Sequence, residues 1–159
     1  MSDKITTCLW FDTEGEEAAQ FYCTLFPNSR IVGVSRYGEA GPRPAGMVMT
    51  VDFELDGRPY VALNGGPDYR FTEAVSFQIS CADQDEVDRY WDTLVADGGE
   101  EGPCGWVKDR FGLSWQVVPA AMPELLSDPD TERANRAMAA MLKMRKLDIA
   151  ALRAAADGA

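Results

Sequence analysis

The chain has 159 residues, of which 46% are hydrophobic and 26% charged, a composition typical of a soluble globular protein with a substantial core. Its formal net charge is -11 at pH 7, so it would repel nucleic-acid backbones and anionic membrane surfaces. The absence of histidine excludes Ser-His and Cys-His nucleophile pairs and removes the commonest metal ligand.

The amino-terminal sequence MSDKITTCLWFD has no basic region followed by an apolar stretch, which argues against a secretory signal. No apolar run approaches the length of a membrane span. The four cysteines form no CxxC pair and no metal-binding cluster; they are Cys8, Cys23, Cys81 and Cys104. We therefore expect a cytoplasmic protein with free, mostly buried thiols and no nucleic-acid or membrane partner.

The first half of the chain predicts a strand, a helix and three further strands. The first strand covers residues 4–11, and the helix begins at a capping box over 13–16. Apolar residues at helical spacing follow at Ala18, Phe21, Tyr22, Leu25 and Phe26. The further strands are predicted at 30–37, 47–55 and 58–63. Asn64-Gly65-Gly66-Pro67 then forms a turn, since a phosphate-binding loop would need a lysine and a following helix.

The same order of elements begins again further along the chain. A strand is predicted over 74–81, and a helix begins where Asp83 precedes Glu86 by three residues. Its apolar stripe comprises Val87, Tyr90, Trp91, Leu94 and Val95, each 69 residues after its counterpart in the first helix. Strands at 103–109 and 113–118, joined by a hairpin, complete the second half. The repeat predicts an α+β fold of two βαβββ-type modules.

The carboxyl-terminal tail differs from both modules. Residues 119–130 form a proline-punctuated linker, residues 131–146 have helical spacing, and a short helix begins after Asp148 as its N-cap. The methionine-rich stripe of the longer helix either packs within the protein or across a homodimer, or forms a partner-binding face. We expect a first module at 1–68, a second at 69–120 and a helical extension at 121–159, together forming one compact domain.

Four segments resemble a known family: LWFDTEGEEAAQFYCTLFP, ALNGGP, EAVSFQISCADQDEVDRYWDTL and CGWVKDRFGLSWQVVP. They are similar to the glyoxalase/bleomycin-resistance/dioxygenase superfamily, also called vicinal oxygen chelate. Within it they resemble the PhnB-like branch, catalogued as "3-demethylubiquinone-9 3-methyltransferase" domains. The resemblance covers roughly residues 4–155 and implies paired modules whose cupped, mixed sheets hold a ligand inside.

The resemblance also implies a divalent metal held by four residues, two from the opening strands and two from the closing strands of the modules. The metal would polarise the paired oxygens of the substrate. The matching positions are near Thr7, Ser76 and Val61, with a one-residue slip open at Val61, and at Gln116 in the segment beginning at Gly112. Neutral hydroxyls and one amide do not offset the cost of stripping water from a divalent ion, so we expect no metal. No Gly-x-Gly pattern joins a strand to a helix, so we also expect no methyl-donor cofactor.

Strand alternation predicts which side chains share the inner surface of the cup. The candidate binding residues are Thr7, Leu9, Phe11, Val61, Leu63, Ser76, Gln78, Trp106 and Gln116. A mostly apolar cavity with a few polar groups is typical of a small-molecule site. The alternative is a closed core in which the polar groups bond one another. Lys108 either binds a substrate anion or is a solvated hairpin charge.

Three functions stay open at this point. The first is a cytoplasmic homodimer that binds a small apolar or aromatic molecule without a metal or other cofactor. The second is an enzyme, either a metal-assisted isomerase or lyase or the methyltransferase that the family description implies. The third is an interaction protein that assembles through its methionine- and alanine-rich tail.

Overall fold

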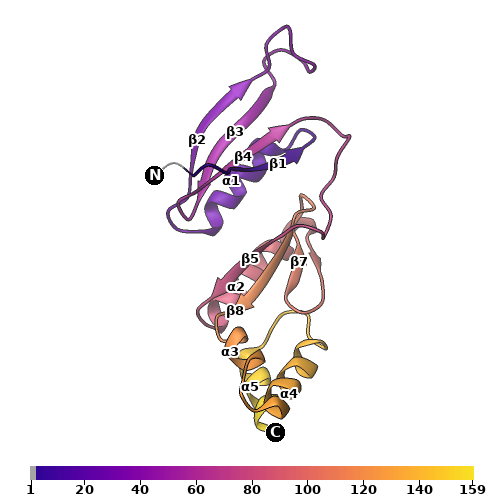
Figure 1. Ribbon diagram of the computed structural model, residues 1–159. Coiled ribbons are helices and arrows are strands. Elements are labelled where there is room, and N and C mark those ends of the chain that lie inside the picture. Colours follow the sequence, from indigo (N-terminus) through magenta and orange to yellow (C-terminus); the bar gives the residue numbers. More distant parts are fainter. Residues whose placement is uncertain (1–2) are drawn as a thin grey trace. The chain divides into compact units, whose positions relative to one another are not determined.

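The computed structural model describes residues 3–159, and the chain divides into two compact units, Met1–Arg70 and Phe71–Ala159. The first unit contains β1 (Thr7–Phe11), α1 (Gly15–Leu25), β2 (Arg30–Arg36), β3 (Val48–Leu55) and β4 (Arg58–Asn64) (Figure 1). The second contains β5 (Ser76–Cys81), α2 (Gln84–Val95), a short 3-10 turn η1 (Ala96–Gly98), β6 (Glu100–Glu101), β7 (Trp106–Lys108) and β8 (Ser114–Pro119). Three helices follow: α3 (Met122–Leu126), α4 (Thr131–Met141) and α5 (Ile149–Asp157). The two βαβββ modules predicted from the repeat are confirmed.

Both units have the same strand order, β1-β4-β3-β2 in the first sheet and β5-β8-β7-β6 in the second. In each unit the opening and closing strands pair in parallel, while the other neighbours are antiparallel. Cys8 therefore lies opposite Val61 in the first sheet, and Gln78 lies opposite Gln116 in the second. The two sheets are mixed, and their equivalent strands can be compared residue by residue.

The core of the first unit lies between its sheet and α1. Buried apolar residues of this core are Leu9, Phe11, Ala18, Ala19, Tyr22, Leu25, Val51, Phe53, Leu55 and Ala62. The start of the helix lies close to β4 because Gly15 has no side chain. A Cβ there would lie 2.7 Å from Oδ1 of Asn64. The opposite face of this sheet carries Cys8, Trp10, Val61 and Leu63, all exposed or half-buried.

In β1 the side chains expected on the inner surface of the cup point to the opposite side of the sheet. Leu9 and Phe11, expected on the inner surface of a cup, are only 4% and 3% exposed and lie in the core beneath α1. The connection from strand to helix has three residues in the first unit (12–14) and two in the second (82–83). The helices therefore match at a shift of 69 residues, whereas the strands match at 70. Because side chains alternate along a strand, a difference of one residue exchanges the two faces.

The helix starts show one correct and one wrong prediction. Asp83 is the N-cap of α2, where its carboxylate accepts the Glu86 amide at 2.9 Å and the Glu86 carboxylate accepts the Ala82 amide at 2.8 Å. In the first unit the N-cap is Glu14, whose side chain makes no capping bond, so the capping box predicted over 13–16 is wrong. Asn64 takes over this role, since its Oδ1 accepts the buried Gly15 amide at 2.8 Å.

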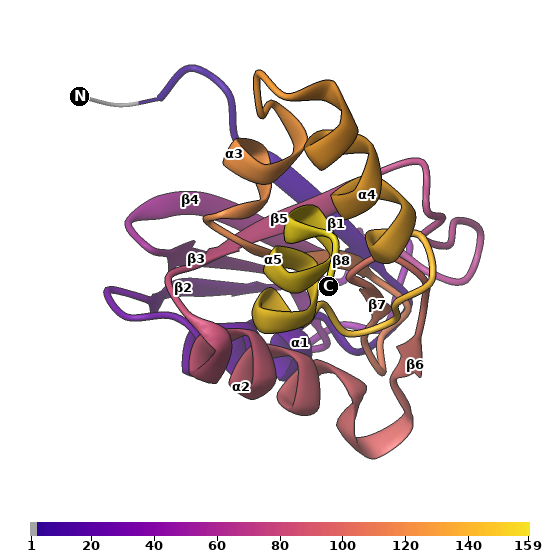
Figure 2. The same ribbon diagram turned by 90° about the horizontal axis from the view of Figure 1, so that it is seen from below.

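The second unit includes the carboxyl-terminal helices. The apolar stripe of α2 packs on one face of the second sheet, and α3, α4 and α5 lie together (Figure 1, Figure 2). Met122, Leu147 and Leu152 form their buried cluster, against which Val118 of β8 packs. The segment 119–130, predicted as a linker because of its prolines, contains the short helix α3. Asp148 caps α5 as predicted. Met138 and Leu142 of the expected stripe remain 39% and 61% exposed.

Two further observations concern the whole described chain. Within residues 3–159, no helix has both the length and the apolar character needed to cross a membrane. All four cysteines are free; Cys81 is buried, Cys8 is exposed, and Cys23 and Cys104 are half-buried. The expectation of mostly buried thiols is therefore wrong for Cys8.

The buried thiol gives a first testable prediction. Desolvation, and secondarily the charge of Glu86, raise the pKa of Cys81 to about 12. At pH 8 its thiolate is scarce, so Ellman's reagent is expected to modify exposed Cys8 rapidly and Cys81 only after unfolding. Peptide mass spectrometry of partly modified protein identifies the sites, and denatured protein serves as the control. Equal rates at Cys8 and Cys81 in folded protein would contradict this prediction.

Candidate functional site

The face of the second sheet opposite α2, which we term the open face, carries two rows of side chains. The first row follows the strand register across Glu100, Lys108, Ser114 and Ser76. The second follows Trp106, Gln116 and Gln78. Directly paired residues point to the same side of a sheet, so each row forms a continuous strip. The row between them, which includes Glu101 and Trp115, faces α2.

The middle of the open face is a chain of hydrogen bonds between side chains. Nε2 of Gln78 donates to Oε1 of Gln116 at 3.2 Å, and Nε2 of Gln116 donates to Oγ of Ser76 at 2.9 Å. Gln116 therefore uses both ends of its amide on neighbouring strands. This holds the amide in one orientation beside the Trp106 indole.

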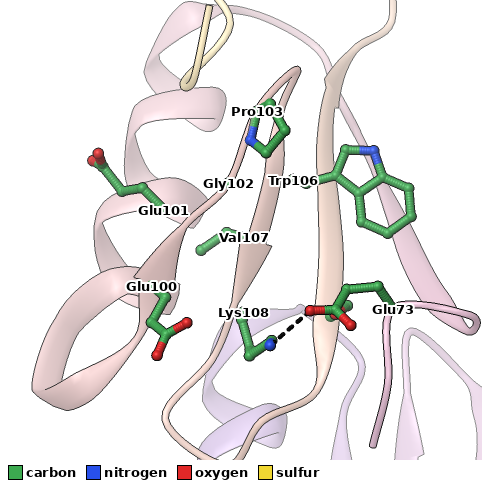
Figure 3. Close-up of a pocket in the computed structure, with 9 residues that line it drawn as sticks. Glu73, Glu100, Glu101, Gly102, Pro103, Trp106, Val107 and Lys108 are labelled. Carbon is green, nitrogen blue, oxygen red and sulfur yellow. Dashed lines mark ion pairs between the residues drawn. The ribbon is translucent and has the colours of Figure 1, made fainter.

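A pocket of about 380 Å³ lies beside these rows at the β6–β7 edge of the sheet (Figure 3). It is lined by Glu73, Glu100, Glu101, Gly102, Pro103, Trp106, Val107, Lys108 and Ser114. Trp106 is half-buried, whereas Ser114 is only 2% exposed. The pocket thus combines one large aromatic surface with a deep hydroxyl group.

Lys108 is held by an acidic partner within this pocket. Its Nζ lies 2.7 Å from Oε1 of Glu73, and Figure 3 shows the two side chains pointing toward each other. The hydrogen bond with Lys108 lowers the pKa of Glu73, and the same bond raises the pKa of Lys108. Both groups are charged at neutral pH. Lys108 is therefore an ion-paired residue whose side chain remains 33% exposed at the hairpin.

The hairpin between β7 and β8 fixes the positions of Trp106 and Gln116. Asp109 is 2% exposed, and its carboxylate accepts the amides of Phe111 and Leu113 at 2.9 and 3.1 Å. Its other oxygen accepts the indole N–H of Trp115 at 2.8 Å. Because this carboxylate ties the turn to β8, it sets the register that brings Trp106 opposite Gln116.

The structure brings together four of the residues that the sequence predicts for a binding site. Ser76, Gln78, Trp106 and Gln116 share the open face of the second sheet. The other five belong to the first unit. Val61 and Leu63 lie on its sheet face away from α1, while Thr7, Leu9 and Phe11 alternate to the other side.

Several residues of the pocket were not among the candidates from the sequence, and three of them bear on its chemistry: Ser114, Glu73 and Glu100. Ser114 shares the alternation of Gln116 and could have been included on that signal. Glu73 lies in an irregular segment, and Glu100 belongs to a strand of only two residues. Neither segment is long enough to show a periodic pattern, so their pairing with β7 comes from the tertiary fold.

The four positions implied for a metal do not fit a divalent ion. Ser76 and Gln116 bond each other, Val61 offers no donor atom, and Thr7 lies on the face of β1 that is directed toward α1. Nowhere in residues 3–159 do three or more His, Cys, Asp or Glu side chains form a group that could hold a metal. The glycine pairs do not fit a methyl-donor cofactor either, since no helix follows Gly65-Gly66 or Gly98-Gly99 directly.

Two successive βαβββ units with one strand order define a protein of the vicinal oxygen chelate class, as the resemblance implied. Residues 3–118 match the family described as "3-demethylubiquinone-9 3-methyltransferase", and the chain belongs to that family. The helices α3 to α5 lie outside the matched residues.

Solved structures and curated sequences give further comparisons. A PhnB protein from Bacillus cereus is 34% identical and has a TM-score of 0.66, with 74% of this chain and 100% of that chain covered. A protein from Pseudomonas aeruginosa is 21% identical and has a TM-score of 0.59, with 74% of this chain and 98% of that chain covered. At this identity the similarity supports the fold alone. No curated protein sequence matches the chain.

Proposed function

We propose that the chain binds a small, largely apolar or aromatic molecule in the pocket beside Trp106, without a metal ion. The observation that carries this proposal is the pocket itself, which is lined by the Trp106 indole and the hydroxyl of Ser114, with the oriented amide of Gln116 opposite Trp106 on the same face of the sheet. Its volume of 380 Å³ is within the roughly 300–1,000 Å³ of small-molecule sites.

Each group has a role that follows from its chemistry. Trp106 supplies a flat apolar surface for stacking. Ser114 within the pocket and Gln116 beside it supply hydrogen bonds that orient the ligand, and the bonds that join Gln116 to Gln78 and Ser76 hold its amide in place beforehand. The remaining alternative from the sequence, polar groups that only bond one another, is consistent with Gln116 but does not account for the pocket.

The proposal includes the cytoplasmic homodimer expected from the sequence. A reducing compartment is supported by the four free cysteines. Light scattering coupled to size-exclusion chromatography tests the dimer, and a mass of one chain would contradict it.

The family description favours a second candidate, a methyltransferase. Binding of S-adenosylmethionine, measured by titration calorimetry, would support it. Since neither glycine pair precedes a helix, we expect no saturable binding of that cofactor.

The proposed site is tested by replacing its aromatic wall. Trp106→Ala is expected to weaken the binding of aromatic probes identified by thermal-shift screening about tenfold or more, because it removes the stacking surface. Calorimetry measures the affinities. Tyr69→Ala removes an exposed aromatic ring from the first unit and serves as the control with unchanged binding. If Trp106→Ala binds the probes as the original protein does, the pocket is not the site.

A further inference from the structure

The charges around the pocket are unequal. Its lining holds three carboxylates, Glu73, Glu100 and Glu101, and one ammonium group, Lys108. Glu73 forms an ion pair with Lys108 at 2.7 Å. Glu101 lies on the α2 side of the sheet, where it accepts the Trp91 indole N–H at 3.1 Å. It also meets Arg145 at 3.6 Å. Two of the carboxylates therefore have positive or N–H partners.

The third carboxylate, Glu100, has Lys108 nearby but makes no close ion pair with it. Glu100 lies opposite Lys108 in the β6–β7 ladder, and the two side chains point to the open face. Within residues 3–159, Glu100 forms no ion pair closer than 4.0 Å. Lys108 is thus flanked by two carboxylates, and the three groups together carry one net negative charge. An anionic ligand would have to displace Glu73 and also approach Glu100.

Ser114 gives the pocket a hydrogen-bonding group. Its side chain is buried, with the residue only 2% exposed, and it lines the pocket. Its hydroxyl makes no hydrogen bond to another side chain or backbone group in the described part of the chain. In the described residues no buried side-chain nitrogen or oxygen lacks a partner, so the Ser114 oxygen is open to the pocket, where a bound molecule can bond to it.

We propose that the natural ligand is a cationic amine with an apolar or aromatic body, an inference that rests on the proposed function and specifies its ligand class. The apolar body stacks on Trp106, and the ammonium group faces Glu100 near the Glu73–Lys108 pair. An ammonium N–H can donate to the Ser114 hydroxyl, which has an acceptor site available. The indole face also attracts a cation directly.

The charge of the whole protein acts in the same direction. A net charge of -11 raises the local concentration of cations at the surface and repels anions. This effect weakens with salt, whereas the contacts within the pocket weaken less. A preference for the cation that persists at 0.5 M salt is therefore the preference of the pocket itself.

Three probes with the same aromatic body separate the effect of charge from that of stacking. They are 2-naphthylmethylamine, 2-naphthylmethanol and the carboxylate 2-naphthaleneacetate. At pH 7 the first is cationic, the second neutral and the third anionic. Calorimetry is expected to show the amine binding about tenfold more tightly than the alcohol, with the carboxylate weakest. Each titration is performed at low salt and again at 0.5 M salt.

Two variants, one in the pocket and one control, are titrated with the same three probes. Glu100→Gln is expected to weaken binding of the amine about threefold to tenfold and to leave the alcohol unchanged, since it removes charge without changing shape. Glu132→Gln, the same substitution at an exposed position of α4, serves as the control with unchanged binding of all three probes.

The outcomes distinguish the two proposals. Equal affinities for the three probes, or tightest binding of the carboxylate, would overturn the cationic ligand and leave the pocket intact as a binding site. If none of the probes and no compound from the aromatic screen binds, the proposed function itself is wrong. An amine preference that Glu100→Gln does not change would place the cation elsewhere and overturn this inference.

Discussion

Asp109→Ala is expected to lower the free energy of unfolding of the second unit by about 3–5 kcal/mol, because it leaves two buried donors and one partly buried donor without their acceptor. These donors are the amides of Phe111 and Leu113 and the indole N–H of Trp115. The Leu113 amide and the Trp115 indole N–H cannot reach water without distorting the hairpin, since these residues are 1% and 2% exposed. Denaturant titration measures the loss, and amide hydrogen exchange shows whether it is centred on β7 and β8.

Two further variants define the cause of this effect. Asp109→Asn keeps one acceptor oxygen but presents an N–H group to one of the three donors, so an intermediate loss is expected. Asp85→Ala removes a carboxylate from an exposed position in the first turn of α2 and should change stability much less. If the loss for Asp109→Ala were no larger than for Asp85→Ala, the carboxylate would not be organising the hairpin. The pairing of β7 with β8 would then be determined by the strands alone.

The elements that sequence reasoning predicted correctly are those with a long periodic signal. Four of the five residues in the predicted apolar stripe of α2 are buried, Val95 is half-buried, and Asp83 caps this helix. In the second sheet, alternation placed Ser76, Gln78 and Gln116 on one face because β5 and β8 each have six residues. A run of that length leaves no ambiguity about which residues share a face.

The failure in β1 has a specific physical origin. A shift of 69 residues aligned the two helices and also matched Thr7 with Ser76, two similar hydroxyl residues, so nothing indicated a change of register. The extra residue lies in the turn that precedes α1, where sequence pattern is weakest. Leu9 and Phe11 then face the helix, as Ile79 and Cys81 do in the second unit.

Buried polar residues were the other feature missed. Asn64 and Asp109 each lie at the end of a strand, in sequences typical of exposed turns. Only the fold shows that each is 2% exposed and accepts a hydrogen bond from a buried backbone amide. Such residues have no periodic signature, because one side chain serves donors that are distant in sequence. The same holds for Glu73, whose partner Lys108 is on a different strand.

Asn64→Leu is expected to destabilise the first unit by about 2–3 kcal/mol, because Leu has the same branched heavy-atom skeleton as Asn but neither of its hydrogen-bonding groups. Oδ1 of Asn64 accepts the Gly15 amide at 2.8 Å, and its Nδ2 donates to the Val48 carbonyl at 3.1 Å. Since Glu14 makes no capping bond, α1 has no other side chain at its start to replace this contact. Hydrogen exchange should therefore accelerate at the first amides of α1 and remain unchanged in α2. Asn135→Leu, at an exposed position of α4, is the matched control. Faster exchange in both helices to the same extent would mean that the loss is global, and that Asn64 does not act as the cap of α1.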